Sequence, residues 1–137
     1  MYHKSIILFL LFPILFLACS KENSVKQSKD FNEKYIVYYF HPTARCESCL
    51  NLESYIKEVI ETKYKNDGFI FKSINIEDKE NEHFRKDYDL KFSSIVLLNK
   101  ENNKWKNLDS IWAYVEAKEE FFRYVQKEIN SFIKIEN

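Results

Sequence analysis

One stretch decides the fold, His41-Pro42-Thr43-Ala44-Arg45-Cys46-Glu47-Ser48-Cys49. It follows the continuous apolar run 35–40, which is typical of a strand buried on both faces. It opens a segment whose apolar residues recur at three- and four-residue steps, as on one face of a helix: Leu52, Tyr55, Ile56, Val59 and Ile60. The sequence therefore places both cysteines where a strand ends and a helix begins.

A thiol at the start of a helix faces unpaired backbone N–H groups and the positive end of the helix dipole. Both stabilise the thiolate, which is the reactive form of cysteine. The C-x-x-C spacing sets Cys49 one helical turn after Cys46, within reach of an intramolecular disulfide. We expect Cys46 to be the attacking thiol and Cys49 the resolving thiol. Arg45 adds positive charge beside Cys46, and Glu47 opposes it.

Two other uses of the cysteine pair stay open at this point. The disulfide could be inert and only tie its loop, as in a scaffold subunit of a reductase complex. The pair could also supply half of a tetrahedral metal or metalloid site, with His41 and His83 as further ligands. No second C-x-x-C is present, so we expect no metal.

The composition of the 137-residue chain limits the function classes. Apolar residues make up 45% of the chain, enough for the core of one small domain. Lys+Arg and Asp+Glu are 21 each, so the formal net charge is zero and nothing supports nucleic-acid binding. With one glycine in the chain, a glycine-rich flavin or nicotinamide loop is excluded, and we expect no cofactor besides the redox-active disulfide.

The N-terminus reads as a targeting segment. Residues 6–18 are almost wholly apolar, which is short for a transmembrane helix and typical of a secretory signal. The sequence Leu15-Phe16-Leu17-Ala18-Cys19 resembles a bacterial lipobox, which predicts a signal peptide over 1–18, cleavage before Cys19 and attachment of acyl chains such as palmitate to Cys19. An uncleaved signal anchor or an ordinary signal peptide are the alternatives. Polar residues then predict a tether over 19–30. The predicted location is the cell envelope, on the membrane, facing the periplasm or the exterior.

We expect the folded domain over 31–137. Its predicted elements are a strand over 35–40, a helix from about Cys46 to Lys65, a strand over 69–76, a short helix around 81–88, a strand over 94–99, an antiparallel strand over 104–106, a short helix over 108–115 and a last helix from Glu119. The single glycine, Gly68, is expected to end the first helix.

The order β-α-β-α-β-β-α resembles a thioredoxin-like fold, an α/β fold with a central mixed sheet flanked by helices. The segments 38–49, 72–75, 83–88 and 105–109 are similar to a bacterial family named nitrophenyl compound nitroreductase subunit, ArsF type. The resemblance implies a protein thiol or disulfide partner, or a redox complex. It also has departures: Arg45 replaces the usual tryptophan, Glu47-Ser48 replaces Gly-Pro, Phe40 occupies the region of the buried acid, and Ser93 or Ser94 replaces the cis-proline.

Three residues besides Arg45 are candidates for a supporting role. His41 could shuttle protons to Cys49, or it could be an ordinary loop histidine. Ser93 and Ser94 could line the dithiol and offer backbone hydrogen bonds to a partner chain, or they could simply begin a strand. Together these observations predict an exported, membrane-anchored thiol–disulfide oxidoreductase or electron-transfer subunit.

Overall fold

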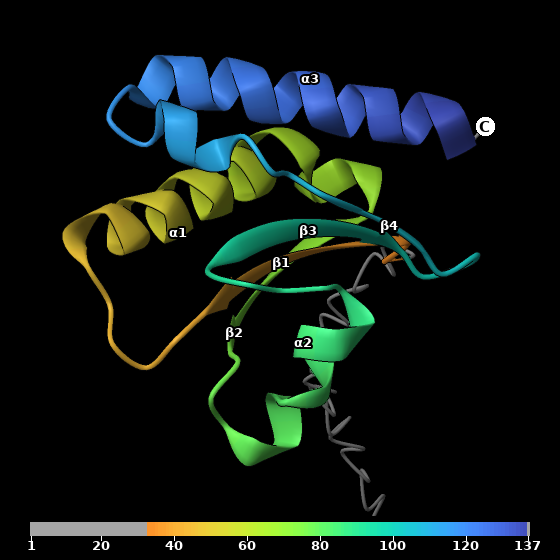
Figure 1. The fold of residues 1–137 in the computed structure, drawn as a ribbon. Coiled ribbons are helices and arrows are strands. Elements are labelled where there is room, and N and C mark those ends of the chain that lie inside the picture. Colours follow the sequence, from red (N-terminus) through yellow and green to blue (C-terminus); the bar gives the residue numbers. More distant parts are fainter. Residues whose placement is uncertain (1–32, 137) are drawn as a thin grey trace, which may run out of the picture.

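The sheet has four strands in the order β2-β1-β3-β4 (Figure 1). The structure, a computed structural model, describes residues 33–136. The strands are β1 (Tyr35–His41), β2 (Phe69–Asn75), β3 (Ser94–Asn99) and β4 (Lys104–Asn107). β2 pairs parallel to β1, whereas β3 and β4 each pair antiparallel to the preceding strand of the sheet. The expected mixed sheet and the expected order of strands and helices are confirmed.

Helices cover both faces of the sheet. α1 (Glu47–Val59) and α3 (Lys118–Glu136) pack together on one face, and α2 (His83–Asp87) lies on the other (Figure 1). A short 3₁₀ turn, η3 (Lys79–Asn81), precedes α2, and another, η4 (Ile111–Tyr114), precedes α3. This arrangement is compatible with a thioredoxin-like fold.

β1 contributes side chains to both hydrophobic cores, as β3 also does. Its odd-numbered side chains, ending with Tyr39, enter the core beneath α1 and α3. Its even-numbered side chains, ending with Phe40, enter the core beneath α2. Since successive side chains of a strand point to opposite faces, a central strand covered on both sides must be apolar throughout. That is why the run 35–40 carries no alternation of polar residues.

The first helix is more complex than expected. The α-helix ends at Val59 and continues as a π-helical turn, η1 (Ile60–Tyr64), and a 3₁₀ turn, η2 (Lys65–Asp67). Ile60 and Tyr64, which begin and end this π-helical turn, are both buried in the core beneath α1 and α3. Gly68 then ends the helical segment with φ 79°, the left-handed conformation that glycine adopts without a Cβ clash.

The predicted signal peptide, Cys19 and the tether lie outside the described residues. Within 33–136, no helix is long and apolar enough to cross a membrane.

Candidate functional site

Cys46 is the N-cap of α1. Its backbone is extended, with φ −86° and ψ 165°, and its Sγ accepts a hydrogen bond of 3.2 Å from the backbone N–H of Cys49. An N-cap side chain satisfies one of the free N–H groups of the first turn, a place usually taken by an oxygen of Ser, Thr, Asn or Asp. Here the sulfur takes that place, in the most positive part of the helix.

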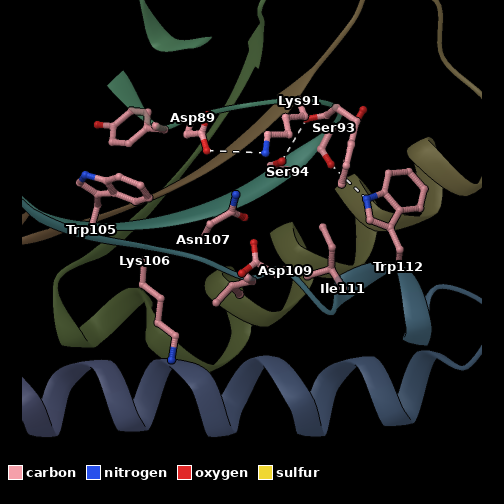
Figure 2. Close-up of a pocket in the computed structure, with 13 residues that line it drawn as sticks. Asp89, Lys91, Ser93, Ser94, Trp105, Lys106, Asn107, Asp109, Ile111 and Trp112 are labelled. Atoms are coloured by element: carbon pink, nitrogen blue, oxygen red, sulfur yellow. Dashed lines mark hydrogen bonds and ion pairs between the residues drawn. The ribbon is translucent and has the colours of Figure 1, made fainter. Parts of the chain in front are cut away.

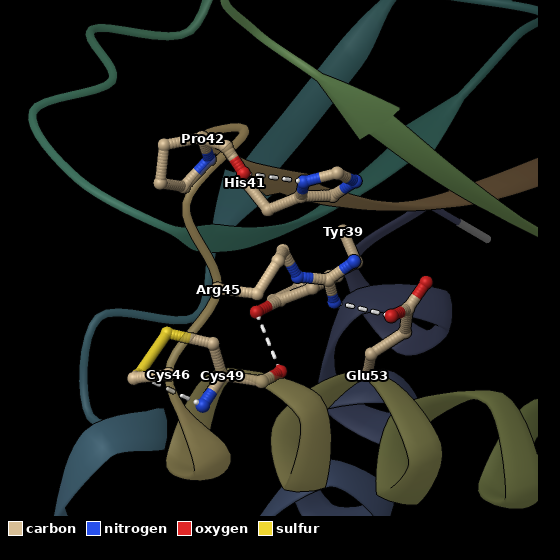
Figure 3. A network of polar contacts seen from close by, with 7 residues as sticks. All are labelled: Tyr39, His41, Pro42, Arg45, Cys46, Cys49 and Glu53. Carbon is tan, nitrogen blue, oxygen red and sulfur yellow. Dashed lines mark hydrogen bonds and ion pairs between the residues drawn. A yellow bond between two sulfur atoms is a disulfide. The ribbon is translucent and has the colours of Figure 1, made fainter.

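Cys46 and Cys49 form a disulfide in this structure (Figure 3). Their Cα atoms lie 5.0 Å apart, within the ordinary range for a disulfide. The two residues differ in solvent exposure: Cys46 is exposed, whereas Cys49 is buried, with 7% of its surface exposed. A partner molecule can therefore approach Cys46 more readily than Cys49.

Tyr39 contacts the dithiol from the sheet, and the sequence did not single it out. Its ring is fully buried, and its hydroxyl donates a 2.7 Å hydrogen bond to the carbonyl oxygen of Cys49. Burial raises the pKa of Tyr39, and the nearby side chains of Arg45 and Ser93 offset part of that rise. The phenol therefore stays a neutral donor at physiological pH. The sequence carried one signal for Tyr39: as an odd-numbered residue of β1, it lies on the face of the strand that packs against α1.

We expected Arg45 to place its positive charge beside Cys46. In the structure its guanidinium forms an ion pair with Glu53 of α1 (Figure 3). Its guanidinium carbon also lies 5.5 Å from the centre of the Tyr39 ring, a cation–π contact. Burial raises the pKa of Glu53, but hydrogen bonds from Ser73 and Arg45 outweigh it, so the pKa falls below its usual value. Glu47, which we expected to oppose Arg45, is exposed.

Glu53 is therefore a further residue that sequence reasoning missed. The signal for it was weak: it follows Cys49 by four residues, one turn along the same helix. Its pairing with Arg45 spans eight residues and joins α1 to the loop before it, which no helical periodicity reports.

His41, the last residue of β1, stacks on Tyr39 with ring centres 5.7 Å apart. Its Nδ1 donates to the carbonyl oxygen of Pro42 at 2.9 Å, since a carbonyl can only accept. The structure thus brings His41 to the Tyr39 side of the site. Its role as a proton shuttle stays a prediction.

The two serines differ in their surroundings, although both are buried, at 5% and 4% exposure. Ser93 lies beside the Tyr39 hydroxyl, and its carbonyl accepts a 3.1 Å bond from the indole of Trp112. Ser94 pairs with Phe40 in the sheet, and its hydroxyl donates to the carbonyl of Phe92 at 3.0 Å. Ser93 therefore joins the dithiol network, whereas the hydroxyl of Ser94 is used within its own loop. No peptide bond in the described part of the chain is cis.

A groove of about 760 Å³ runs from this serine loop along β4 (Figure 2). Trp112 lies at one end, with Ser93, and Trp105 lies at the other. Ser48, between the two cysteines, donates a 3.3 Å hydrogen bond to Glu116, which follows η4. The Trp112 end of the groove thus lies toward the dithiol.

His83 lies in α2, across the sheet from α1, and its ring packs on Phe84. Among residues 33–136, no group of three or more His, Cys, Asp and Glu side chains is arranged to hold a metal ion.

Comparisons with known proteins add little to this geometry. No family model matches the chain, and no curated protein matches it. One solved structure, described as "Structure of a malarial protein", superposes with a TM-score of 0.39 at 16% identity, over 61% of this chain and 94% of that one. The resemblance to the ArsF-type family stays a prediction.

Proposed function

We propose that this chain is an exported, lipid-anchored thiol–disulfide oxidoreductase or electron-transfer subunit of thioredoxin-like fold that uses the Cys46/Cys49 pair. One observation carries the proposal: a disulfide at the N-cap of a helix, with one exposed and one buried cysteine. The exposed cysteine is suited to attack and the buried one to resolve, because only the former can meet a second molecule. The positive end of α1 favours the thiolate of the attacking residue.

The exchange is a sequence of two displacements. In the reduced form, the Cys46 thiolate attacks one sulfur of the partner's disulfide, which breaks that bond and releases one partner thiolate. The Cys49 thiol then gives its proton to the released partner thiolate or to solvent, and the Cys49 thiolate attacks the Cys46 sulfur. This forms the Cys46–Cys49 disulfide and releases the second partner thiolate. Two electrons pass from this dithiol to the partner, and the same steps run in reverse when the partner is a dithiol.

The anchor and the location rest on the sequence. A lipidated Cys19 would hold the domain at the membrane of the cell envelope through the tether 19–30. Lipidation also removes Cys19 from thiol chemistry, which leaves Cys46 and Cys49 as the pair. The partner we propose is a protein thiol or disulfide, in keeping with the similarity to a nitroreductase subunit.

Trapping tests this function. A Cys49→Ser variant retains the attacking thiol but cannot resolve, so it should accumulate a mixed disulfide with its partner, stable without reductant and identifiable by mass spectrometry. The matched control is Cys46→Ser, which keeps the buried cysteine and should trap far less. A third variant with both substitutions reports any adduct formed through Cys19. Equal trapping by the two single variants, or none above the double variant, would refute the assignment.

A further inference from the structure

We infer that Arg45 and Glu53 are a positioning pair that sets how readily the Cys46–Cys49 disulfide is reduced. The inference rests on the proposed function, and it concerns residues that contact the dithiol loop rather than the reacting sulfurs. Neither side chain takes part in the bond changes at sulfur, so both are positioning residues and not catalytic ones.

The charges of Arg45 and Glu53 lie on either side of the disulfide in the sequence. Arg45 immediately precedes Cys46, and Glu53 lies one helical turn beyond Cys49, so the ion pair flanks the disulfide along the chain. The side chains are 21% and 25% exposed. Partly buried charges interact more strongly with nearby groups than fully solvated ones do.

The arginine is held in place. The Tyr39 ring supports its guanidinium at 5.5 Å, and the Tyr39 hydroxyl binds the Cys49 carbonyl at 2.7 Å. Tyr39 thus contacts both the positive charge and the helix turn that carries the dithiol (Figure 3). The Arg45 Nε is buried and has no hydrogen-bond partner among the described residues, so the ion pair with Glu53 is its guanidinium's principal polar contact.

Reduction of the disulfide creates a thiolate at Cys46, so a lone positive charge beside it favours the reduced form and a lone negative charge favours the disulfide. In the native chain the two charges compensate each other. Removing Glu53 leaves the positive charge of Arg45 alone, whereas removing Arg45 leaves the negative charge of Glu53 alone. The two removals should therefore shift the redox equilibrium in opposite directions.

The experiment equilibrates the full-length protein with glutathione buffers of defined ratio and measures the fraction of Cys46–Cys49 disulfide. Glu53→Gln should favour the dithiol by about threefold to tenfold, and Arg45→Gln should favour the disulfide by a similar factor; tenfold is about 30 mV for this two-electron couple. The pH dependence of Cys46 alkylation should move with it, with the midpoint lower in Glu53→Gln and higher in Arg45→Gln. Arg45→Lys keeps the charge and should stay near the native value.

Two further variants separate this effect from simple loosening of the loop. The double variant Arg45→Gln/Glu53→Gln lacks both charges and should return toward the native equilibrium. Glu128→Gln is a matched control, because it removes a carboxylate of α3, away from the disulfide, that is 16% exposed and paired at 2.5 Å with Lys106 of β4. It should leave the equilibrium unchanged.

The results overturn the inference in a recognisable way. Shifts of the same sign in both single variants would mean that the pair only packs the loop, and shifts below about twofold would mean that it has no influence on the dithiol. If the native protein itself does not exchange with glutathione, the proposed function fails first and the inference fails with it. A native protein that exchanges while its variants do not diverge refutes the inference alone.

Discussion

Replacing Tyr39 by Phe tests the hydrogen bond through which this residue of β1 holds the turn that carries Cys49. The substitution removes only the hydroxyl that donates to the Cys49 carbonyl at 2.7 Å, and it keeps the fully buried ring on which Arg45 and His41 stack. No larger cavity is opened, so the loss should report the bond itself.

The expected magnitude follows from the burial of both partners. A buried hydrogen bond contributes about 1 kcal/mol net, and leaving a buried acceptor without it costs about 1 to 3 kcal/mol. The Cys49 carbonyl lies inside α1, where the helix offers it a backbone donor as well, so we place the loss near the lower end, about 1 to 1.5 kcal/mol. For a domain of this size, each kcal/mol lowers the melting temperature by about 4 to 8 °C.

The assay is urea unfolding of the oxidised and the reduced protein, with thermal melting as a second measurement. Tyr55→Phe is the matched control, because this half-buried tyrosine packs on Phe121 through its ring and its hydroxyl makes no hydrogen bond with a described residue. A Tyr39→Phe protein that unfolds at the same urea concentration as Tyr55→Phe would refute the importance we give to this contact. A changed slope of the unfolding curve would instead indicate a different denatured state.

Three further predictions concern the fold and its pH range. Phe121 is fully buried in the centre of the α1–α3 core, so Phe121→Ala should lower the free energy of unfolding by about 3 to 5 kcal/mol in urea titrations. Phe122→Ala, at the half-buried neighbour, should lower it by much less. Gly68→Ala places a Cβ at φ 79° and should cost about 1 to 2 kcal/mol in the same assay; no loss would contradict the left-handed turn. Burial raises the pKa of Tyr88 to about 12, so stability should fall as pH rises from about 10 to 12, and Tyr88→Phe should flatten that decline in alkaline melting curves.

Local patterns in the sequence predicted the strands and helices well. The unbroken apolar run at 35–40 predicted a strand buried on both faces, and β1 does place side chains in both cores. The stripe containing Phe121, Val125 and Ile129 predicted the last helix and its buried face. The end of α1 was predicted less well, because the apolar spacing of the sequence does not distinguish the π turn at Ile60 from a regular helix.

The site was predicted only where its residues are close in sequence. The helix-start position and the C-x-x-C spacing point to a disulfide without any knowledge of tertiary contacts. Tyr39 and Glu53 depend instead on the docking of α1 against β1, which brings a phenol and a carboxylate to a loop between them. The neighbours of Arg45 in sequence suggested Glu47 as its counter-charge, but chain geometry favours Glu53 because that side chain is partly buried beside it.

The loop that carries Cys46 is held by contacts on two sides, which matters for the partner selectivity of the proposed exchange. On one side, the Thr43 N–H donates to Glu77 at 2.9 Å, and Asn75 donates to the Thr43 hydroxyl at 3.0 Å, which attaches the loop to the end of β2. On the other side, the pair of Arg45 and Glu53 attaches it to α1. In the proposed exchange, contacts of this kind would hold the Cys46 sulfur in one geometry, so that specificity would come from the shape around the sulfur and not from rearrangement of the loop. Loss of either attachment should leave the accessibility of Cys46 unchanged, because its exposure follows from its N-cap position. The same loss should make Cys46 less selective among disulfide partners, because the flanking contacts fix its orientation.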